Sequence, residues 1–425
     1  MTSPRSSLTL RAMRAPLLSL LALGCASDPL ARQGDASTAG DVPADRPWPF
    51  SEPGRHTVTV TETRQVIPGE GLPPETPAGN SNNNLDVVRH DGRVYLAWRT
   101  APDHFASSET RLFVVSSADE RTWRYETRLS LDRDLREPRF LAWNNRLFLY
   151  VSRLGTDPMR FEPQGVSVTE RRGDGSWSAL EDVNLPGAIA WRTRVERGTP
   201  YMLAYRGGEN IYLFNNLPLD VDLLTTTDGR AWTPVDPAMR TVYHGGGSEA
   251  DMALGDDGTL FAVIRNEAGD DTGFGSLVCR APPGAPARWS CRPDPKKYDS
   301  PLMFWHDGEA WLVARRNVTD DGHYDRRQTG LNRTAQSVQN QLAYGNTPKR
   351  CALWRYVQGE DRFAWVLDLP SRGDTCFPAT LTTANPEERV IYDYSSPIDG
   401  DDVSWRVGQR GPTRIYRHLL RFTRR

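Results

Sequence analysis

The chain of 425 residues contains 35 Gly, 32 Pro and 13 Trp, and its formal net charge is −2 at pH 7. This composition favours many short strands joined by turns over long helices. The near-neutral charge provides no basic field for a phosphate backbone, which argues against nucleic acid as a partner.

The N-terminus has the pattern of an export signal. Three arginines precede an apolar run over residues 16–24, which ends at Cys25. The run is too short for a permanent membrane span, and small or apolar residues before a cysteine are typical of a bacterial lipoprotein signal. We predict a signal peptide over 1–25, lipidation of Cys25 and a flexible tether over 26–55. The protein would then lie in the bacterial cell envelope, bound to the membrane through its lipid anchor only. The alternative is an ordinary cleaved signal.

One pattern recurs six times after this segment: a polar turn, then an apolar strand that ends in a polar residue. The copies cover residues 91–99, 144–152, 197–206, 257–265, 307–315 and 388–394. Each copy reads as part of a hairpin with a further strand pair behind it. The spacing of about 50 residues is that of a four-stranded propeller blade.

The six repeats predict an all-β fold, a monomeric six-bladed β-propeller of four-stranded antiparallel blades over residues 56–425. Residues 57–63 would pair with residues 413–422 in the last blade. This N-terminal strand would close the ring and remove its open sheet edges.

The residues that end the repeated strands occupy equivalent places around the ring. They are Arg99, Ser152, Arg206, Arg265, Arg315 and Tyr394. A guanidinium binds carboxylate or phosphate through a rigid fork, so converging arginines would form an anion clamp. In the alternative, each arginine lies at the rim and pairs with a nearby Asp or Glu.

Polar residues also precede the first strand of five repeats. They are Asn83, Arg136, Glu249, Asp299 and Asp374. We expect Arg136, Asp299 and Asp374 to join the substrate-binding residues. Glu249 and Asp251 alternate with small or apolar residues, so both carboxylates would point to one face of a strand. Asp251 could instead cap a turn or pair with Arg265.

Four cysteines follow Cys25 and would mature in an oxidising compartment, where disulfides persist. Cys279 and Cys291 flank a turn rich in Pro and Gly and could join a hairpin, which leaves Cys351 and Cys376 as the second pair. No CxxC motif or His cluster accompanies them, so metal binding is the weaker interpretation.

Two segments look like Asp-box turns, Ser117 to Trp123 and Thr226 to Trp232. With the repeats, they make residues 80–422 resemble the sialidase superfamily as a divergent member. The Asp boxes are structural turns, so they support the six-bladed fold rather than an activity. The resemblance implies three arginines that grip a substrate carboxylate, a tyrosine nucleophile paired with a glutamate, and an aspartate as acid/base.

The resemblance assigns several of these roles to residues of this chain. Glu249 matches the glutamate, Arg265 the second arginine, and Arg315 or Arg316 the third. The loop that should carry the acid/base contains Asp103 and His104; histidine is the natural proton donor near neutral pH.

Two positions depart from the family pattern. Asn83 stands near the expected first arginine, and Phe377, which has no hydroxyl, stands near the expected tyrosine. Tyr392 and Tyr394 are the candidate substitutes, with Glu249 as the carboxylate that would take the hydroxyl proton.

We therefore expect an envelope-anchored exo-glycosidase that acts on an anionic or polyhydroxylated glycan without a cofactor or a metal. Retaining chemistry would use Glu249 with Tyr394 or a local carboxylate, and Asp103 or His104 across the scissile bond. One alternative is a non-catalytic propeller that binds glycan or protein on its axial face. Another is a propeller with unrelated chemistry, because one fold hosts many functions.

Overall fold

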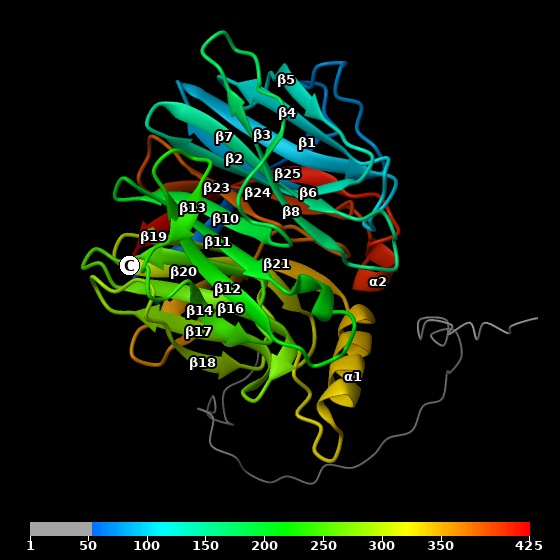
Figure 1. The fold of residues 1–425 in the computed structure, drawn as a ribbon, viewed down its shortest axis with the longest axis vertical. Coiled ribbons are helices and arrows are strands. Elements are labelled where there is room, and N and C mark those ends of the chain that lie inside the picture. Colours follow the sequence, from blue (N-terminus) through cyan, green and yellow to red (C-terminus); the bar gives the residue numbers. More distant parts are fainter. Residues whose placement is uncertain (1–52) are drawn as a thin grey trace, which may run out of the picture. The chain divides into compact units, whose positions relative to one another are not determined.

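A computed structural model describes residues 53–425, which form six antiparallel sheets set around one axis as the blades of a propeller (Figure 1). The predicted six-bladed fold is confirmed. The signal peptide predicted over 1–25, the lipidation of Cys25 and the tether up to residue 52 lie outside the described residues. Within the described part of the chain, no helix is both long and apolar enough to cross a membrane.

The blades, numbered I–VI, follow the chain. Blades I and II comprise β2 (Ser81–His90), β3 (Arg93–Ala101), β4 (Arg111–Ser117) and β5 (Arg124–Leu129), then β6 (Asp134–Trp143), β7 (Arg146–Leu154), β8 (Pro163–Arg171) and β9 (Glu181–Asp182). Blades III and IV comprise β10 (Ile189–Glu196), β11 (Thr199–Arg206), β12 (Leu219–Thr226), β13 (Trp232–Pro234) and an added β14 (Thr241–Gly245), then β15 (Ala250–Leu254), β16 (Leu260–Asp270), β17 (Gly273–Ala281) and β18 (Ser290–Asp294). Blades V and VI comprise β19 (Asp299–His306), β20 (Glu309–Asn317), β21 (Lys349–Val357) and β22 (Arg362–Asp368), then β23 (Ala379–Thr382), β24 (Glu388–Ser395), β25 (Arg414–Arg424) and β1 (His56–Ile67).

The second strand of a blade is buried on both faces because each blade packs between two others. On β3, Val94, Leu96 and Trp98 belong to one apolar cluster, whereas Tyr95 and Ala97 belong to another. Successive side chains of a strand point to opposite faces, so a strand that is buried on both faces has apolar residues at every position. This packing explains why the repeats read as nearly continuous apolar runs rather than as an alternation.

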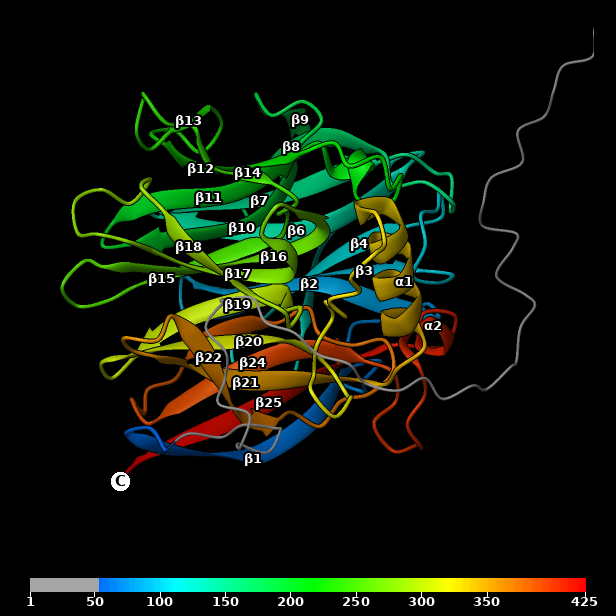
Figure 2. The same ribbon diagram turned by 90° about the horizontal axis from the view of Figure 1, so that it is seen from below.

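The strand β1 closes the ring. It pairs antiparallel with β25, beginning with His56 opposite Arg424. Figure 2 shows the two strands, blue and red, side by side at one edge of the molecule. The predicted pairing of residues 57–63 with the last blade is therefore confirmed.

The two Asp-box segments form turns between the third and fourth strands of their blades. Asp119 Oδ1 accepts the backbone N–H groups of Arg121 and Thr122 at 2.8 Å each, and Ser117 Oγ donates to the same oxygen. These bonds, that of Thr122 first, lower the pKa of Asp119. Asp228 accepts two backbone N–H groups in the same way. The structural role expected of these turns is confirmed.

Both predicted disulfides are present, Cys279–Cys291 and Cys351–Cys376. The first joins residues directly opposite each other on β17 and β18. The second joins β21 of blade V to the segment that precedes β23 of blade VI. It therefore ties two blades together.

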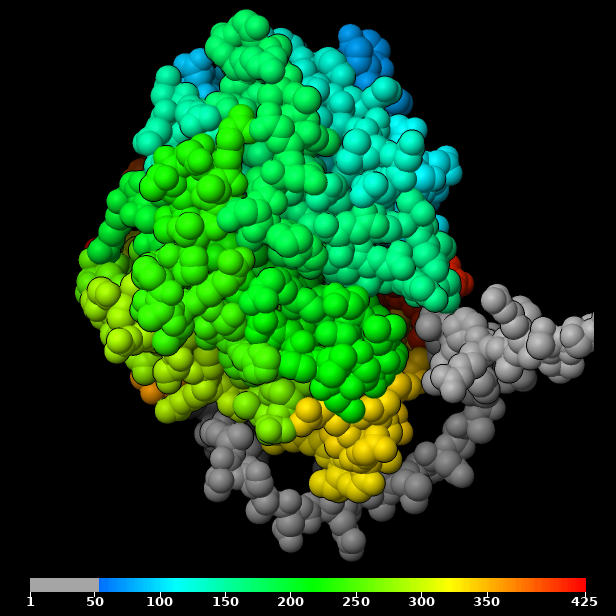
Figure 3. All heavy atoms as spheres, in the orientation of Figure 1, coloured from blue at the N-terminus to red at the C-terminus, as the bar shows by residue number. Residues whose placement is uncertain are grey.

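Blade V carries a helical insertion that the repeat pattern does not predict. Between β20 and β21 lies α1 (Arg333–Gly345), capped by Asn332, whose side chain accepts the Ala335 N–H. In Figure 2, α1 lies at the same end of the blades as α2 (Trp405–Gly408). A loop after β11, which holds the short helix η2 (Gly208–Asn210), touches α1 where Asn216 Nδ2 donates to Thr334 Oγ1 at 2.9 Å. Figure 3 shows this green segment against the gold insertion.

Candidate functional site

The first strands of three blades begin with a bulge. Near the start of β2, β6 and β19 a register shift coincides with positive φ at Asn84 (42°), Glu137 (52°) and Ser300 (52°). Bulges bend a strand and re-aim its side chains, and they are frequent beside functional sites. Here they occur where polar residues of neighbouring blades meet at one end of the axis.

We call the polar side chains that gather at this end the axial cluster. It consists of Arg99, His104, Asp134, Arg136, Glu137, Glu249, Arg265, Glu267, Lys297, Asp299, Arg315, Tyr344, Asp374, Tyr394 and Trp405. It reaches the surface through His104, Arg136, Glu137 and Glu249, whose side chains are 10–19% exposed. Two surface hollows, of about 310 and 400 Å³, lie elsewhere, over the outer strands of blades I and II.

Arg265 on β16 is the centre of charge pairing. Its Nη1 lies 2.8 Å from Glu249 Oε1, 3.1 Å from Glu267 Oε2 and 3.7 Å from Asp299 Oδ1. Burial alone would lower the pKa of Arg265, but Glu249 and then Glu267 raise it well above its usual value. The guanidinium therefore stays charged and is held by three carboxylates.

Asp299 joins blade V to this centre. It accepts the Tyr344 hydroxyl at 2.5 Å, and it lies 3.2 Å from Arg315 Nη1 and 3.4 Å from Lys297 Nζ. Burial would raise the pKa of Asp299, but Lys297, Arg315 and Arg265 together hold it below its usual range. Asp299 is therefore an ionised bridge between cations, which suits a positioning role.

Glu249 is a carboxyl of the axial cluster whose pKa lies near neutral pH. Burial raises the pKa of Glu249 to about 7; Arg265 opposes this shift, whereas Asp299 and Glu137 reinforce it. Its Oε2 accepts the Ser300 backbone N–H at 2.8 Å. A carboxyl group with a pKa near the working pH is suited to general acid–base catalysis.

A second chain of contacts runs from Arg315 to His104. Tyr394 Oη lies 3.3 Å from Arg315 Nη2 and donates to Asp374 Oδ1 at 3.0 Å. Asp374 Oδ2 lies 2.7 Å from His104 Nδ1. Burial, reinforced by Asp374, raises the pKa of the Tyr394 hydroxyl well above its usual value. The carboxylate beside Tyr394 is therefore Asp374, and not Glu249 as the sequence suggested.

Arginines of blades I and II fix the loop that carries His104. Arg136 Nη2 donates to the His104 carbonyl at 2.9 Å, and Asp134 pairs with both Arg136 and Arg99. The fully buried Arg99 donates to the backbone carbonyls on either side of His104, at 3.2 and 2.7 Å. Arg99 therefore holds the backbone of this loop in place and does not face a ligand.

The two acid/base candidates differ in their surroundings. Asp103 Oδ1 accepts the backbone N–H of Phe105 at 2.9 Å, so this carboxylate caps the turn. The ring of His104 instead contacts the buried Asp374 and keeps a partly exposed edge. The geometry therefore favours His104 over Asp103 for proton transfer.

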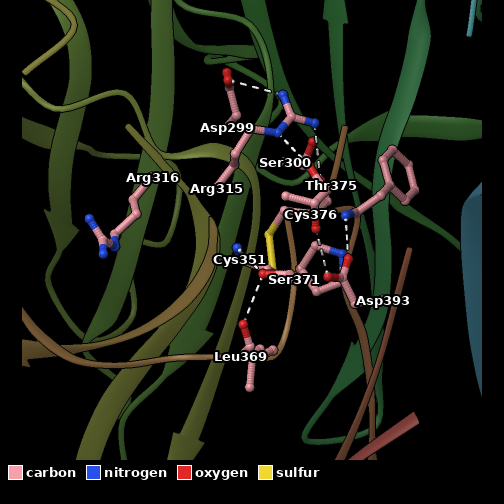
Figure 4. Close-up of a disulfide and its surroundings, with 12 residues drawn as sticks. Asp299, Ser300, Arg315, Arg316, Cys351, Leu369, Ser371, Thr375, Cys376 and Asp393 are labelled. Atoms are coloured by element: carbon pink, nitrogen blue, oxygen red, sulfur yellow. Dashed lines mark hydrogen bonds and ion pairs between the residues drawn. A yellow bond between two sulfur atoms is a disulfide. The ribbon is translucent and has the colours of Figure 1, made fainter. Parts of the chain in front are cut away.

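Two of the predicted arginines do not reach the axial cluster. Arg206 pairs with Asp222 within blade III, at 3.0 Å, and its side chain is 37% exposed. Arg316 pairs with Asp368, and Figure 4 shows it pointing away from Arg315. Consecutive residues of a strand face opposite sides, so Arg316 cannot share the site of Arg315. Arg206 and Arg316 therefore follow the alternative expected from the sequence, in which an arginine pairs with a nearby carboxylate instead of joining an anion clamp.

Tyr392 and Asp251 also lie outside the cluster. The Tyr392 hydroxyl donates to Glu120 at 2.8 Å, away from the axis. Asp251 faces the axis as Glu249 does, but its carboxylate lies 3.4 Å from Arg192 Nε and accepts the Met303 backbone N–H. It therefore belongs to a separate charged group further along the axis and does not pair with Arg265.

The two departures from the family pattern are both buried. Phe377 packs against Trp191, with ring centres 5.2 Å apart, and against the Arg139 guanidinium at 4.3 Å. Asn83 accepts a hydrogen bond from Arg99 Nη1 at 3.3 Å. Neither position supplies a tyrosine or an arginine to the site.

Sequence reasoning missed six members of the cluster: Asp134, Glu137, Glu267, Lys297, Tyr344 and Trp405. Glu267 and Lys297 stand two residues from Arg265 and Asp299, so the alternation of an extended chain could have placed them on the same face. Lys297 Nζ lies 2.5 Å from Glu267 and 4.1 Å from the centre of the Tyr344 ring. Trp405 Nε1 donates to Asp374 at 3.0 Å from α2, outside the repeats.

One further group has the residue types of a metal site. The sulfur atoms of Cys351 and Cys376 and an oxygen of Asp393 all lie within 4.8 Å of one another. The two sulfurs are joined in a disulfide, as Figure 4 shows, so they are not thiolate ligands. This arrangement does not fit a metal.

Solved structures share the six-bladed architecture. A Dyadobacter fermentans protein of unknown function aligns with a TM-score of 0.55 and 15% identity over 86% of this chain and 99% of its own. A phage phi92 endosialidase gives 0.56 and 11% over 87% of this chain and 70% of its own. Trypanosoma rangeli sialidase with the inhibitor DANA gives 0.51 and 13% over 80% of this chain and 55% of its own.

No family model and no curated protein sequence matches this chain. At such low identities the structural likeness establishes the fold, which is that of the sialidase-like six-bladed propellers. The fold expected from the sequence resemblance is thereby confirmed.

Proposed function

We propose that this protein is an exo-acting glycoside hydrolase whose active site is the axial cluster. The observation that carries the proposal is the placement of two proton-transfer groups. Glu249 precedes the first strand of blade IV, and His104 follows the second strand of blade I. These blades stand three places apart in a ring of six, so the two groups flank the axis from opposite sides, as paired groups flank a scissile glycosidic bond.

The proposed reaction uses Glu249 as the proton donor. Glu249 protonates the glycosidic oxygen, the bond from that oxygen to the anomeric carbon breaks, and the leaving group departs as an alcohol. His104 takes a proton from the attacking water, whose oxygen bonds to the anomeric carbon. Asp374, bound to His104 Nδ1 at 2.7 Å, stabilises the imidazolium. This route inverts the anomeric configuration.

The tyrosine route expected from the sequence makes the opposite stereochemical prediction. Tyr394 would attack the anomeric carbon, with Asp374 as the carboxylate that takes its proton, and the product would retain configuration. Its hydroxyl is bound between Arg315 and Asp374 in a nearly inaccessible place, which favours a positioning role. Proton NMR of the first product distinguishes the routes, and Tyr394→Phe should abolish turnover only in the tyrosine route.

The proposal is tested by screening residues 53–425 against aryl glycosides, a sialoside included. Glu249→Gln should lower kcat by about 10²–10⁴-fold on any substrate found. Glu387→Gln is the matched control, because Glu387 is exposed on the turn between β23 and β24. Full activity of Glu249→Gln would refute the assigned role.

A non-catalytic glycan-binding propeller is the second candidate. The burial of Phe377 near the expected nucleophile favours it, because that position offers no hydroxyl. Binding of a glycan without turnover of any aryl glycoside would support this candidate over the hydrolase.

We further propose that the protein is a monomer anchored to the bacterial cell envelope through acylated Cys25. The apolar run before Cys25 and the two disulfides, which persist in oxidising compartments, support export. Metabolic labelling with a radioactive fatty acid should label the protein and fail for Cys25→Ser. Gel filtration of residues 53–425 tests the monomer.

A further inference from the structure

The guanidinium groups of the axial cluster are occupied by the protein itself. Arg315 Nε donates to the Thr375 carbonyl at 2.5 Å, and its Nη1 lies 3.2 Å from Asp299. Its Nη2 donates to the Cys376 carbonyl and to Tyr394 Oη, both at 3.3 Å. Figure 4 shows this fork directed at Asp299 and the 375–376 backbone. No nitrogen of Arg315 is left over to grip a ligand carboxylate.

Arg99 is engaged in the same way. Its Nε donates to Asp134 at 3.0 Å, its Nη1 to Asn83 and the Asp103 carbonyl, and its Nη2 to the Phe105 carbonyl. The side chain is fully buried. A ligand anion could reach Arg99 only by breaking the loop that carries His104.

Arg265 is paired with more carboxylates than the other arginines of the axial cluster. Glu249, Glu267 and Asp299 lie within 3.7 Å of its Nη1, and its Nε donates to Ser248 Oγ at 3.0 Å. Lys297 also pairs with Glu267 and Asp299, and Arg315 with Asp299, so these three carboxylates neutralise three cations. A ligand carboxylate would have to compete with these protein carboxylates for Arg265.

Two of the four side chains that reach the surface are carboxylates, and the arginine among the four, Arg136, is bound to Asp134 and to the His104 carbonyl. The side chains of Glu137 and Glu249 are each 10% exposed, whereas Arg265 and Arg315 are more deeply buried. Near-neighbour like charges repel strongly in a partly desolvated site. Carboxylates are, however, strong acceptors for hydroxyl groups. Glu137 Oε2 is buried and accepts no hydrogen bond from the described residues, and it lies 3.9 Å from Arg139 Nη2.

We propose that the axial cluster takes a neutral, polyhydroxylated sugar unit and rejects the carboxylated sugars for which an arginine clamp would be built. The proposal rests on the proposed function, since it names the substrate class of the same site. The sugar hydroxyls donate to Glu137 and Glu249, and the arginines remain bound to their protein acceptors.

Matched ligand pairs test this proposal. Aryl glucoside against aryl glucuronide, and galactoside against galacturonide, differ by a hydroxymethyl group in place of a carboxylate. Binding of each to residues 53–425, by calorimetry at low salt, should favour the neutral member of at least one pair by tenfold or more. Equal or tighter binding of the carboxylated member, or of a sialoside, overturns the proposal, as does binding of neither class.

A variant tests the electrostatic cause. Glu249→Gln keeps an oxygen for the Ser300 N–H but frees Arg265 from one carboxylate, so the ratio of uronide to neutral affinity should rise by about tenfold, which corresponds to about 1.4 kcal/mol. The exposed control Glu387→Gln should leave that ratio unchanged. An unchanged ratio in Glu249→Gln would show that charge is not the cause.

The failure of this proposal can be told from that of the proposed function. Hydrolysis confined to a glucuronide or a sialoside keeps the hydrolase and overturns the neutral substrate. Binding of a neutral sugar without any turnover removes the hydrolase and leaves the substrate class standing.

Discussion

The carboxyl of Glu249 determines the pH dependence expected of the reaction. Burial raises the pKa of Glu249 to about 7, and Glu137 contributes to that shift by like-charge repulsion. The protonated donor is therefore lost as the pH rises through 7, so kcat/KM should fall on the basic side. Glu137→Gln removes the repulsion and should move this basic limb to lower pH.

Profiles of kcat/KM against pH, recorded for both proteins on one aryl glycoside, measure the shift. The control Glu387→Gln should superimpose on the unmodified protein. A basic limb that stays in place in Glu137→Gln would contradict the proposed coupling between the two glutamates.

Asp393 makes a separate prediction for stability. It is buried beside the Cys351–Cys376 disulfide and accepts the Phe377 backbone N–H at 2.8 Å. Burial raises the pKa of Asp393 from 3.8 to about 7. Between these values the folded form holds a proton that the unfolded form releases, so stability falls as the pH rises from about 4 to 7. The loss in the free energy of unfolding that is due to Asp393 is at most about 4 kcal/mol over this pH range.

Asp393→Asn should remove much of this pH dependence, because the amide oxygen can still accept the backbone N–H. Urea unfolding at pH 5 and pH 8 measures the change in the free energy of unfolding. Glu249, whose pKa is also raised, acts in the same direction, so part of the dependence should persist. An identical loss of stability between the two pH values in both proteins would assign the effect elsewhere.

At the scale of elements, the two disulfides should have different consequences for the site. Each closes a loop, of 12 residues for Cys279–Cys291 and 25 for Cys351–Cys376, and each should stabilise by about 3 kcal/mol. Only the second holds backbone that accepts hydrogen bonds from Arg315. Replacing Cys351 and Cys376 by Ser should therefore lower both Tm and activity.

The double Ser variant of Cys279 and Cys291 is the matched control, since that bridge lies within the outer hairpin of blade IV. It should lower Tm by a similar amount and leave KM and kcat unchanged. Equal loss of activity in both variants would mean that the site responds to overall stability rather than to the 375–376 backbone.

The bulges explain why the sequence predicted the strands better than the site. Strand alternation correctly placed Glu249 and Asp251 on one face, because β15 pairs regularly with β16. Around Glu137 and Ser300 the register shifts, and one extra residue reverses which side chains face the axis. No pattern of apolar residues signals such a shift, so Glu137 was not found.

Elements outside the repeat were equally hidden. Tyr344 comes from α1, within a segment of blade V that no other blade contains, and its hydroxyl reaches Asp299. The Asn332 cap marks where this helix begins, but a weakly apolar helix of 13 residues is not distinctive in the sequence. The repeat predicts the strands that all blades share, whereas the site also uses residues from segments that occur in one blade only, such as α1.

At the scale of the whole molecule, the repeat was sufficient for the fold. Six hairpins of similar spacing determine the number of blades, and the last copy lacked an outer strand that residues 57–63 could supply. Equivalent position in a repeat did not give equivalent surroundings. Arg206 ends its sequence repeat as Arg265 does, yet Asp220 and Asp222 on the next strand bind Arg206 within blade III.

Closure by β1 leads to a prediction for the intact ring. A chain that begins at Pro68 lacks β1, which leaves the backbone edge of β25 unpaired and removes Val58 from the apolar cluster that contains Phe422. Exposed edges of this kind pair with other chains. We expect the shortened chain to aggregate or to unfold at a lower temperature than a chain that begins at residue 53, as measured by gel filtration and thermal unfolding.

A peptide of residues 53–67, added in trans, should restore the monomer, because an extended peptide can complete an open sheet edge. A peptide of the same composition in scrambled order should not, since it lacks the alternation that buries Val58 against the cluster. A shortened chain that stays monomeric with an unchanged Tm would show that β1 does not stabilise the propeller. Rescue by the native peptide, and not by the scrambled one, would show that the fold is completed when the N-terminal strand pairs with the last blade.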